Sequence, residues 1–115
     1  MKKVIEVYFY KSSAGNEPVR EWLLELDKDD KKSIGADIKA VEFGFPIGLP
    51  LVKKIDSGLW EVRSNLKSDK IARVLFTIKD SKMILLHGFI KKSQKLSKQD
   101  KQIAISRKKE IDSEV

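Results

Sequence analysis

Three runs rich in β-branched and aromatic residues lie between residues 59 and 90, with only short polar segments between them. The runs are Leu59–Arg63, Ile71–Ile78 and Met83–Ile90, and the separating turns are residues 65–69 and 80–81. Strands joined by short turns pair antiparallel with their neighbours along the chain. We therefore predict a three-stranded antiparallel meander, one face of which must be buried by other elements.

A strand and two amphipathic helices are predicted before the meander. Residues 4–10 are rich in β-branched and aromatic side chains and are typical of a strand. The first helix follows a cap at Asn16 and has an apolar stripe of Val19, Trp22, Leu23 and Leu26. The second follows a new cap at residues 27–30, has a stripe of Ile34, Ile38, Val41 and Phe45, and is stopped by Gly44 and Pro46. The stripes indicate a helical hairpin packed on the sheet, with Trp22 as a packing residue.

A last helix is predicted from Ser97, which forms a capping-box pattern with Asp100, to about Ile111. Its apolar stripe is thin, so we expect it to lie loosely on the surface. Residues 44–50, with their glycines and prolines, are interpreted as a loop. The predicted fold is α+β, in the order βααβββα, with a two-helix hairpin on a small, mostly antiparallel four-stranded sheet. The 115 residues fit a single domain, 1–115.

Composition excludes several classes of protein. A hydrophobic content of 41% is too high for a disordered chain. No apolar run approaches the roughly 20 residues of a membrane helix, and the start of the chain lacks the features of a signal peptide. The chain has no cysteine, which excludes disulfides and thiolate metal sites. These observations favour a cytoplasmic protein.

The positive charge is concentrated in the second half of the chain. Residues 1–58 contain ten Lys/Arg and ten Asp/Glu, whereas residues 59–115 contain fourteen and seven, so the whole net charge of +7 lies there. A one-sided basic surface attracts polyanions, and nucleic acid is the partner that we favour. The alternative is a solvated, lysine-rich surface that promotes solubility. A membrane-surface function is less favoured, because no basic amphipathic helix with aromatic anchors is present.

Two arginines are candidates for a phosphate site. Side chains alternate along a strand, so Arg73 is expected on the open face of its strand, opposite the helix-covered face. Arg63 is expected on the same face of the neighbouring strand, beside Glu61. Adjacent guanidinium groups repel each other unless an anion lies between them, and phosphate fits their planar geometry. Alternatively, Arg63 pairs with Glu61.

Further cations follow the third meander strand. Candidate RNA-binding residues are Lys91, Lys98 and Lys101, together with Lys70 in an earlier turn, although such lysines are often merely solvated. His87, the single histidine, is either a hydrogen-bonded core residue or a general base. The sequence has no metal-ligand spacing, glycine-rich phosphate loop or nucleophile elbow. Any catalysis would therefore use Arg, Lys and His, without a cofactor.

Three segments together resemble the RelE/ParE toxin superfamily, and in particular its HigB-like, phage-derived branch. The segments are Gly58-Leu59-Trp60-Glu61-Val62-Arg63, Ala72-Arg73-Val74-Leu75-Phe76, and the run from Leu85 to Lys95 that ends in Lys-Lys-Ser-Gln-Lys. The resemblance extends to Ile103-Ala104 and covers nearly the whole chain. Two positions differ from the usual pattern, because Ala72 replaces an aromatic residue and Lys95-Leu96-Ser97 replaces Lys-Thr-Pro.

The resemblance implies the toxin of a type II toxin–antitoxin pair, which enters the ribosomal A site and cleaves mRNA without a metal. The ribose 2′-hydroxyl would attack the adjacent phosphate. Arg73 and Arg63 would bind that phosphate, Lys92 and Lys95 would add charge and acid or base function, and His87 would carry a proton. The expected partners are a small helix-turn-helix antitoxin, the ribosome and mRNA, and no membrane. The alternatives are a ParE-like gyrase poison without RNase activity and a non-enzymatic RNA- or ribosome-binding module.

Overall fold

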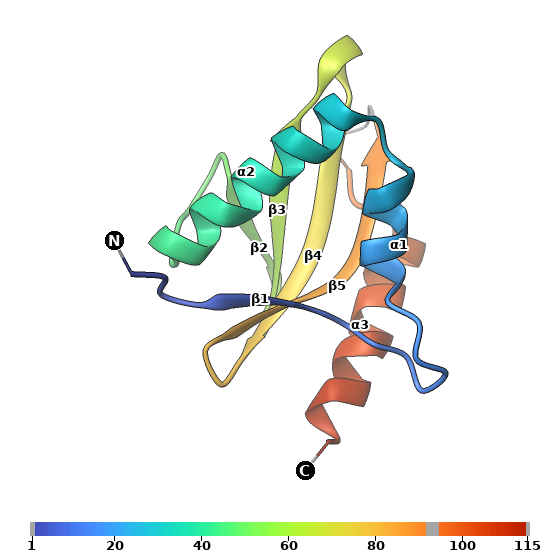
Figure 1. Ribbon diagram of the computed structural model, residues 1–115. Coiled ribbons are helices and arrows are strands. Elements are labelled where there is room, and N and C mark those ends of the chain that lie inside the picture. The colour runs from blue at the N-terminus through green and yellow to red at the C-terminus, as the bar shows by residue number, and fades with distance from the viewer. Residues whose placement is uncertain (1, 92–94, 115) are drawn as a thin grey trace.

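A computed structural model describes residues 2–91 and 95–114. The elements, in order, are β1 (Glu6–Phe9), α1 (Pro18–Glu25), α2 (Lys28–Gly44), β2 (Val52–Asp56), β3 (Leu59–Asn65), the short 3-10 helix η1 (Lys67–Asp69), β4 (Ile71–Lys79), β5 (Lys82–Lys91) and α3 (Lys98–Asp112) (Figure 1). The α+β class and the antiparallel β3–β4–β5 meander are confirmed.

The sheet has five strands in the order β1-β5-β4-β3-β2, so the prediction of four strands is wrong. The additional strand is β2, which pairs antiparallel with β3 at the edge of the sheet. Its sequence, VKKID, exposes both lysines, and charged residues of this kind protect an edge strand from pairing further. β1 lies at the opposite edge and pairs parallel with β5.

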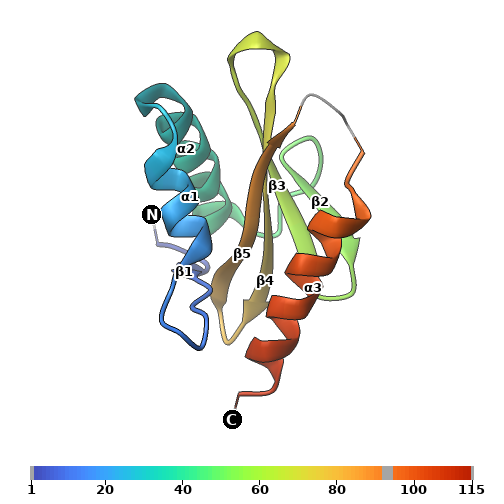
Figure 2. The same ribbon diagram turned by 90° about the vertical axis from the view of Figure 1, so that its right-hand side faces the viewer.

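Helices cover both faces of the sheet (Figure 2). α1 and α2 pack on the face that carries Ala72, Val74 and Phe76, as the alternation along β4 predicts. α3 packs on the other face with a second apolar cluster, in which Ala104 and Ile111 are buried against Leu75, Leu86 and Phe89. The expectation that α3 lies loosely on the surface is therefore wrong. A thin stripe is sufficient because a small residue such as Ala104, which is fully buried, lets the helix approach the strands closely.

The helix ends show which caps the sequence indicates correctly. Asp27 caps α2 by accepting a hydrogen bond from Asp30 N at 2.8 Å, and Ser97 caps α3 by accepting one from Asp100 N at 3.1 Å. The predicted cap at Asn16 is wrong, because α1 starts at Pro18 and its N-cap is Glu17, whose side chain makes no capping bond. None of the described helices is long and apolar enough to cross a membrane.

Candidate functional site

The pairing register places nine side chains in a three-by-three grid on the sheet face that α3 covers. Alternate residues of β3, β4 and β5 point to this face. The three rows across the strands are Asn65, Ile71 and Lys91; Arg63, Arg73 and Phe89; and Glu61, Leu75 and His87. Both arginines, the histidine and one lysine from the predicted site therefore meet on one surface, which we call the grid face.

Arg63 and Arg73 are direct partners across β3 and β4, as predicted. The Glu61 carboxylate forms an ion pair with each of them, at 3.6 Å from Arg63 Nε and 3.6 Å from Arg73 Nη1. The alternative that Arg63 pairs with Glu61 is thus observed, and Arg73 shares the same carboxylate. The expectation that Arg73 lies on an open face is wrong, because its exposed fraction is 2% on the face where α3 packs. Arg63, with 20% of its side chain exposed, is the accessible member.

Burial changes the pKa of the Glu61 carboxyl group. Loss of solvent around this fully buried side chain raises its pKa, and the positive charges of Arg73, Arg63 and Lys53 oppose that rise. Desolvation disfavours a carboxylate anion, whereas neighbouring cations favour it. The two guanidinium groups are therefore held together by a carboxylate that has no access to water.

A second network joins β5 to the first turn of α3. Asp100 Oδ1 lies 2.8 Å from His87 Nε2, and Asp100 Oδ2 accepts hydrogen bonds from Lys91 Nζ and Ser97 Oγ, both at 2.6 Å. Burial opposes ionisation of Asp100, but hydrogen bonds from Lys91, Ser97 and His87 outweigh it and lower its pKa to about 2. His87 is half-buried, and its ring centroid lies 5.5 Å from that of Phe89.

The remaining candidate lysines are more dispersed. Lys95 and Lys98 are exposed at the approach to α3 and at its first residue, and Lys70 is exposed in the turn before β4. Lys101 points toward β2, where its Nζ lies 3.6 Å from the Asp56 carboxylate. Lys92, a predicted catalytic residue, lies outside the described residues. The structure thus brings Arg63, Arg73, His87 and Lys91 together on the grid face. The other described candidate lysines, Lys70, Lys95, Lys98 and Lys101, lie outside the grid.

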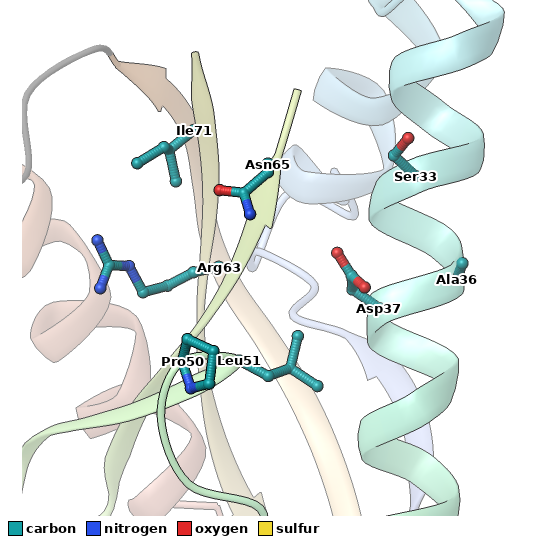
Figure 3. A pocket seen from close by; sticks show the side chains of 8 residues that line it. All are labelled: Ser33, Ala36, Asp37, Pro50, Leu51, Arg63, Asn65 and Ile71. Carbon is teal, nitrogen blue, oxygen red and sulfur yellow. The ribbon is translucent and has the colours of Figure 1, made fainter. Parts of the chain in front are cut away.

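A cleft of about 660 Å³ adjoins the grid face at the free end of β3. Its lining residues come from α2, from the segment before β2 and from β3 and β4: Ser33, Ala36, Asp37, Pro50, Leu51, Arg63, Asn65 and Ile71. Figure 3 shows Asp37 pointing from α2 toward the strands, whereas Arg63 extends away from α2. Strand β2 pairs with β3 as far as Val62, and Arg63 N donates a hydrogen bond to Leu51 O at 2.9 Å, so the segment before β2 borders the cleft beside Arg63.

Sequence reasoning did not select Asn65, Ile71, Asp100 or Glu61 as site residues. Asn65 and Ile71 could have been found by extending the alternation that selects Arg63 and Arg73 to the ends of their strands. The network role of Asp100 depends on where α3 packs, and the burial of Glu61 depends on tertiary packing around the two arginines; the sequence indicates neither. Among the described residues, no group of three or more His, Asp or Glu side chains is arranged to hold a metal ion.

The family model described as "Phage derived protein Gp49-like (DUF891)" matches residues 21–109. The chain belongs to this family. Gp49-like proteins are associated with RelE-like toxins, which agrees at this level with the resemblance of the strand sequences. The matched range contains every candidate site residue named above. No curated protein matches the chain.

Proposed function

We propose that this Gp49-like protein is the toxin of a type II toxin–antitoxin pair and cleaves mRNA on the ribosome without a metal ion. The observation that carries the proposal is the grid face, where Arg63, His87 and Lys91 surround a surface backed by the Arg73–Glu61 pair. A phosphodiester needs cations for its charge and a proton acceptor for the attacking hydroxyl. The grid face supplies both, and the net charge of +7 attracts RNA to it.

In the proposed reaction, the ribose 2′-oxygen attacks the adjacent phosphorus as its proton passes to a base. The bond from phosphorus to the 5′-oxygen then breaks, and an acid protonates that oxygen. The products are a 2′,3′-cyclic phosphate and a 5′-hydroxyl end. Negative charge grows on the phosphate oxygens in the transition state, so fixed cations accelerate the step.

The burial pattern suggests different roles for the two arginines. Arg63 is the residue that can contact the scissile phosphate, together with Lys91 and Lys95 at the edge of the site. Arg73 helps to fix the position of Arg63, because both guanidinium groups are paired with the Glu61 carboxylate. With an exposed fraction of 2%, Arg73 is proposed to act through Glu61 and Arg63 and not by direct contact with the phosphate. Lys92 would add further charge next to Lys91.

The proposed partner in the cell is a small helix-turn-helix antitoxin encoded beside this gene. A nuclease that acts on mRNA must be neutralised in the cell that makes it. Binding that covers Arg63 and Lys91 would block access of RNA to the grid face. Stable high-level expression of the protein alone, without any growth defect, would contradict the toxin proposal.

The decisive experiment incubates the purified protein with translating ribosomes and maps mRNA ends by primer extension. We expect new ends in the A-site codon that carry a 5′-hydroxyl, and no cleavage when the nucleotide at that position is 2′-deoxy. Arg63→Ala should lower the rate by about a hundredfold, whereas Arg20→Ala, which removes an exposed side chain of α1, is the matched control and should cleave normally. Ribosome binding without new ends would indicate a binding module, and inhibition of gyrase alone would indicate a ParE-like activity.

A further inference from the structure

The Asp100 carboxylate departs from its usual role in a capping box. An acidic residue three positions after the N-cap ordinarily accepts a hydrogen bond from the backbone N–H of the cap. Here Asp100 Oδ2 accepts from Ser97 Oγ and Lys91 Nζ, and Asp100 Oδ1 faces His87 Nε2 at 2.8 Å. The carboxylate therefore connects the N-terminus of α3 to two residues of the grid face, in addition to its contact with the N-cap residue Ser97.

The contact between His87 and Asp100 defines which ring nitrogen carries a proton. An ionised carboxylate can only accept hydrogen bonds, and the pKa of Asp100, lowered to about 2, keeps it ionised at neutral pH. His87 Nε2 must therefore carry a hydrogen to make the 2.8 Å contact. In a neutral imidazole the other nitrogen, Nδ1, then has a free lone pair. Within the described residues Nδ1 has no hydrogen-bond partner.

We propose that Asp100 is a positioning residue that fixes the Nε2–H tautomer of His87 and thereby leaves Nδ1 to accept the proton of the ribose 2′-hydroxyl. This inference rests on the proposed RNase function for its chemistry, but the tautomer itself does not. The proton passes from the 2′-oxygen to Nδ1, the bond from the 2′-oxygen to phosphorus forms, and the bond to the 5′-oxygen breaks. The imidazolium that results is stabilised by the adjacent carboxylate, as in other carboxylate–histidine pairs.

Asp100→Asn provides a sharp test because its neighbours dictate how the amide is oriented. Lys91 Nζ and Ser97 Oγ both donate to Oδ2, so the amide oxygen is expected to stay on their side. The amide NH₂ group then faces His87 and donates to Nε2. The variant should therefore invert the tautomer, with the proton on Nδ1 and no free lone pair for the substrate.

The tautomer can be measured directly because His87 is the only histidine in the chain. We would label the protein with ¹⁵N-histidine and record the signals of the two ring nitrogens at a pH high enough that they no longer change on further addition of base, where the ring is neutral. The wild type should carry the proton on Nε2, and Asp100→Asn should carry it on Nδ1. Asp112→Asn, on the same helix and paired with Lys108 at 2.6 Å, is the matched control and should resemble the wild type. A wild-type proton on Nδ1 would overturn the inference even if the Asp100 variant did not fold.

Single-turnover cleavage on programmed ribosomes then tests the consequence. Asp100→Asn and His87→Ala should each lower the rate by about a hundredfold or more with ribosome binding unchanged, and the double variant should be no worse than His87→Ala. If the wild type does not cleave, the RNase proposal fails while the tautomer result stands. If the wild type cleaves and Asp100→Asn cleaves equally fast, the positioning role fails and the RNase proposal stands.

Discussion

At the residue scale, Arg73 and Glu61 form a buried ion pair in the candidate site, so the proposed role of Arg73 has to be separated from its structural role. Both side chains are almost completely buried, and each lies 3.6 Å from its partner. A buried ion pair contributes little net stability, but removing one member leaves an uncompensated charge. Replacement of Arg73 therefore combines any effect on RNA with an effect on folding.

We predict that Arg73→Ala lowers the free energy of unfolding by about 3 kcal/mol. Arg63→Ala should cost less, because Arg63 is partly exposed and Glu61 keeps Arg73 as a partner. The measurement is urea unfolding followed by tryptophan fluorescence. Combining Arg73→Met with Glu61→Gln should recover most of the loss, since the charge that Arg73 compensates is then absent. An Arg73→Ala variant as stable as the wild type would show that the pair is not structurally important.

The low pKa of Asp100 predicts a pH-dependent component of stability. The folded-state pKa of about 2 lies below the ordinary value of 3.8, so the unfolded chain takes up the proton first as pH falls. The stabilisation from Asp100 is thus complete above about pH 4 and is lost between about pH 4 and pH 2. We expect the stability difference between wild type and Asp100→Asn to shrink by about 1–2 kcal/mol over that interval. A difference that is constant with pH would contradict the network.

The sequence predicts which residues share a surface better than it predicts their environment. Alternation along a strand is a local rule, and it correctly places Arg63 and Arg73 side by side. Whether that surface is open depends on α3, whose sequence gives only a thin apolar stripe. The burial of Arg73 and the pairing of Asp100 with His87 are tertiary results, and local patterns do not contain them.

At the scale of elements, α1 packs closely on β5 at Gly88. A Cβ atom at this position would lie 2.5 Å from the Trp22 ring, which is well inside van der Waals contact. The absence of a side chain therefore lets the indole of α1 lie against the strand. This contact explains why Trp22, predicted as a packing residue from its place in the stripe, is partly buried against the core.

Two glycine-to-alanine substitutions should have opposite effects. Gly88→Ala should destabilise the protein by about 1–3 kcal/mol, because α1 or the indole must shift. Gly35→Ala, inside α2, meets no atom within 4 Å and should stabilise by about 0.5–1 kcal/mol through better helix propensity. Thermal and urea unfolding measure both. Equal effects would show that Trp22 does not pack on Gly88 in solution.

Strand β2 was not predicted, because its own sequence does not indicate a strand. Val52–Asp56 has two lysines among five residues and too few apolar positions to stand out as a strand. It forms because β3 offers an edge and because Ser57-Gly58 turns the chain, with Gly58 at φ 67°. A Cβ there would also lie 2.9 Å from the Lys108 side chain of α3. The meander, in contrast, was predictable because its strands are long, apolar and joined by short turns.

At the scale of the whole molecule, the excess positive charge and the grid face derive from the same half of the chain. Residues 59–115 contain the entire net charge of +7, and they form β3, β4, β5 and α3. Lysines near the site can therefore act in two ways. A contact to a remote phosphate adds affinity and salt dependence, whereas a contact to the reacting phosphate lowers the barrier.

We predict that these two kinds of lysine separate experimentally. Lys95→Ala, and likewise Lys92→Ala, should lower the single-turnover cleavage rate by about a hundredfold while ribosome binding falls only modestly. Lys98→Ala should mainly weaken binding and reduce the salt dependence by close to one phosphate contact. Lys101→Ala should have a smaller effect on the salt dependence, because Asp56 lies 3.6 Å from Lys101 and already compensates part of its charge.

The Asp56 ion pair supplies the control for this last prediction. Asp56→Asn removes the competing carboxylate without touching a lysine, so it should strengthen ribosome binding at low salt and make it more salt-dependent. The effect should disappear when Lys101 is alanine, because the two residues act through one contact. Binding and cleavage would be measured in parallel across salt concentrations on programmed ribosomes. If all the lysine variants lose affinity alike and keep the wild-type rate once bound, these lysines only bind RNA electrostatically and do not take part in the reaction. Catalysis would then have to reside in the grid face itself, with Arg63, Arg73 and His87.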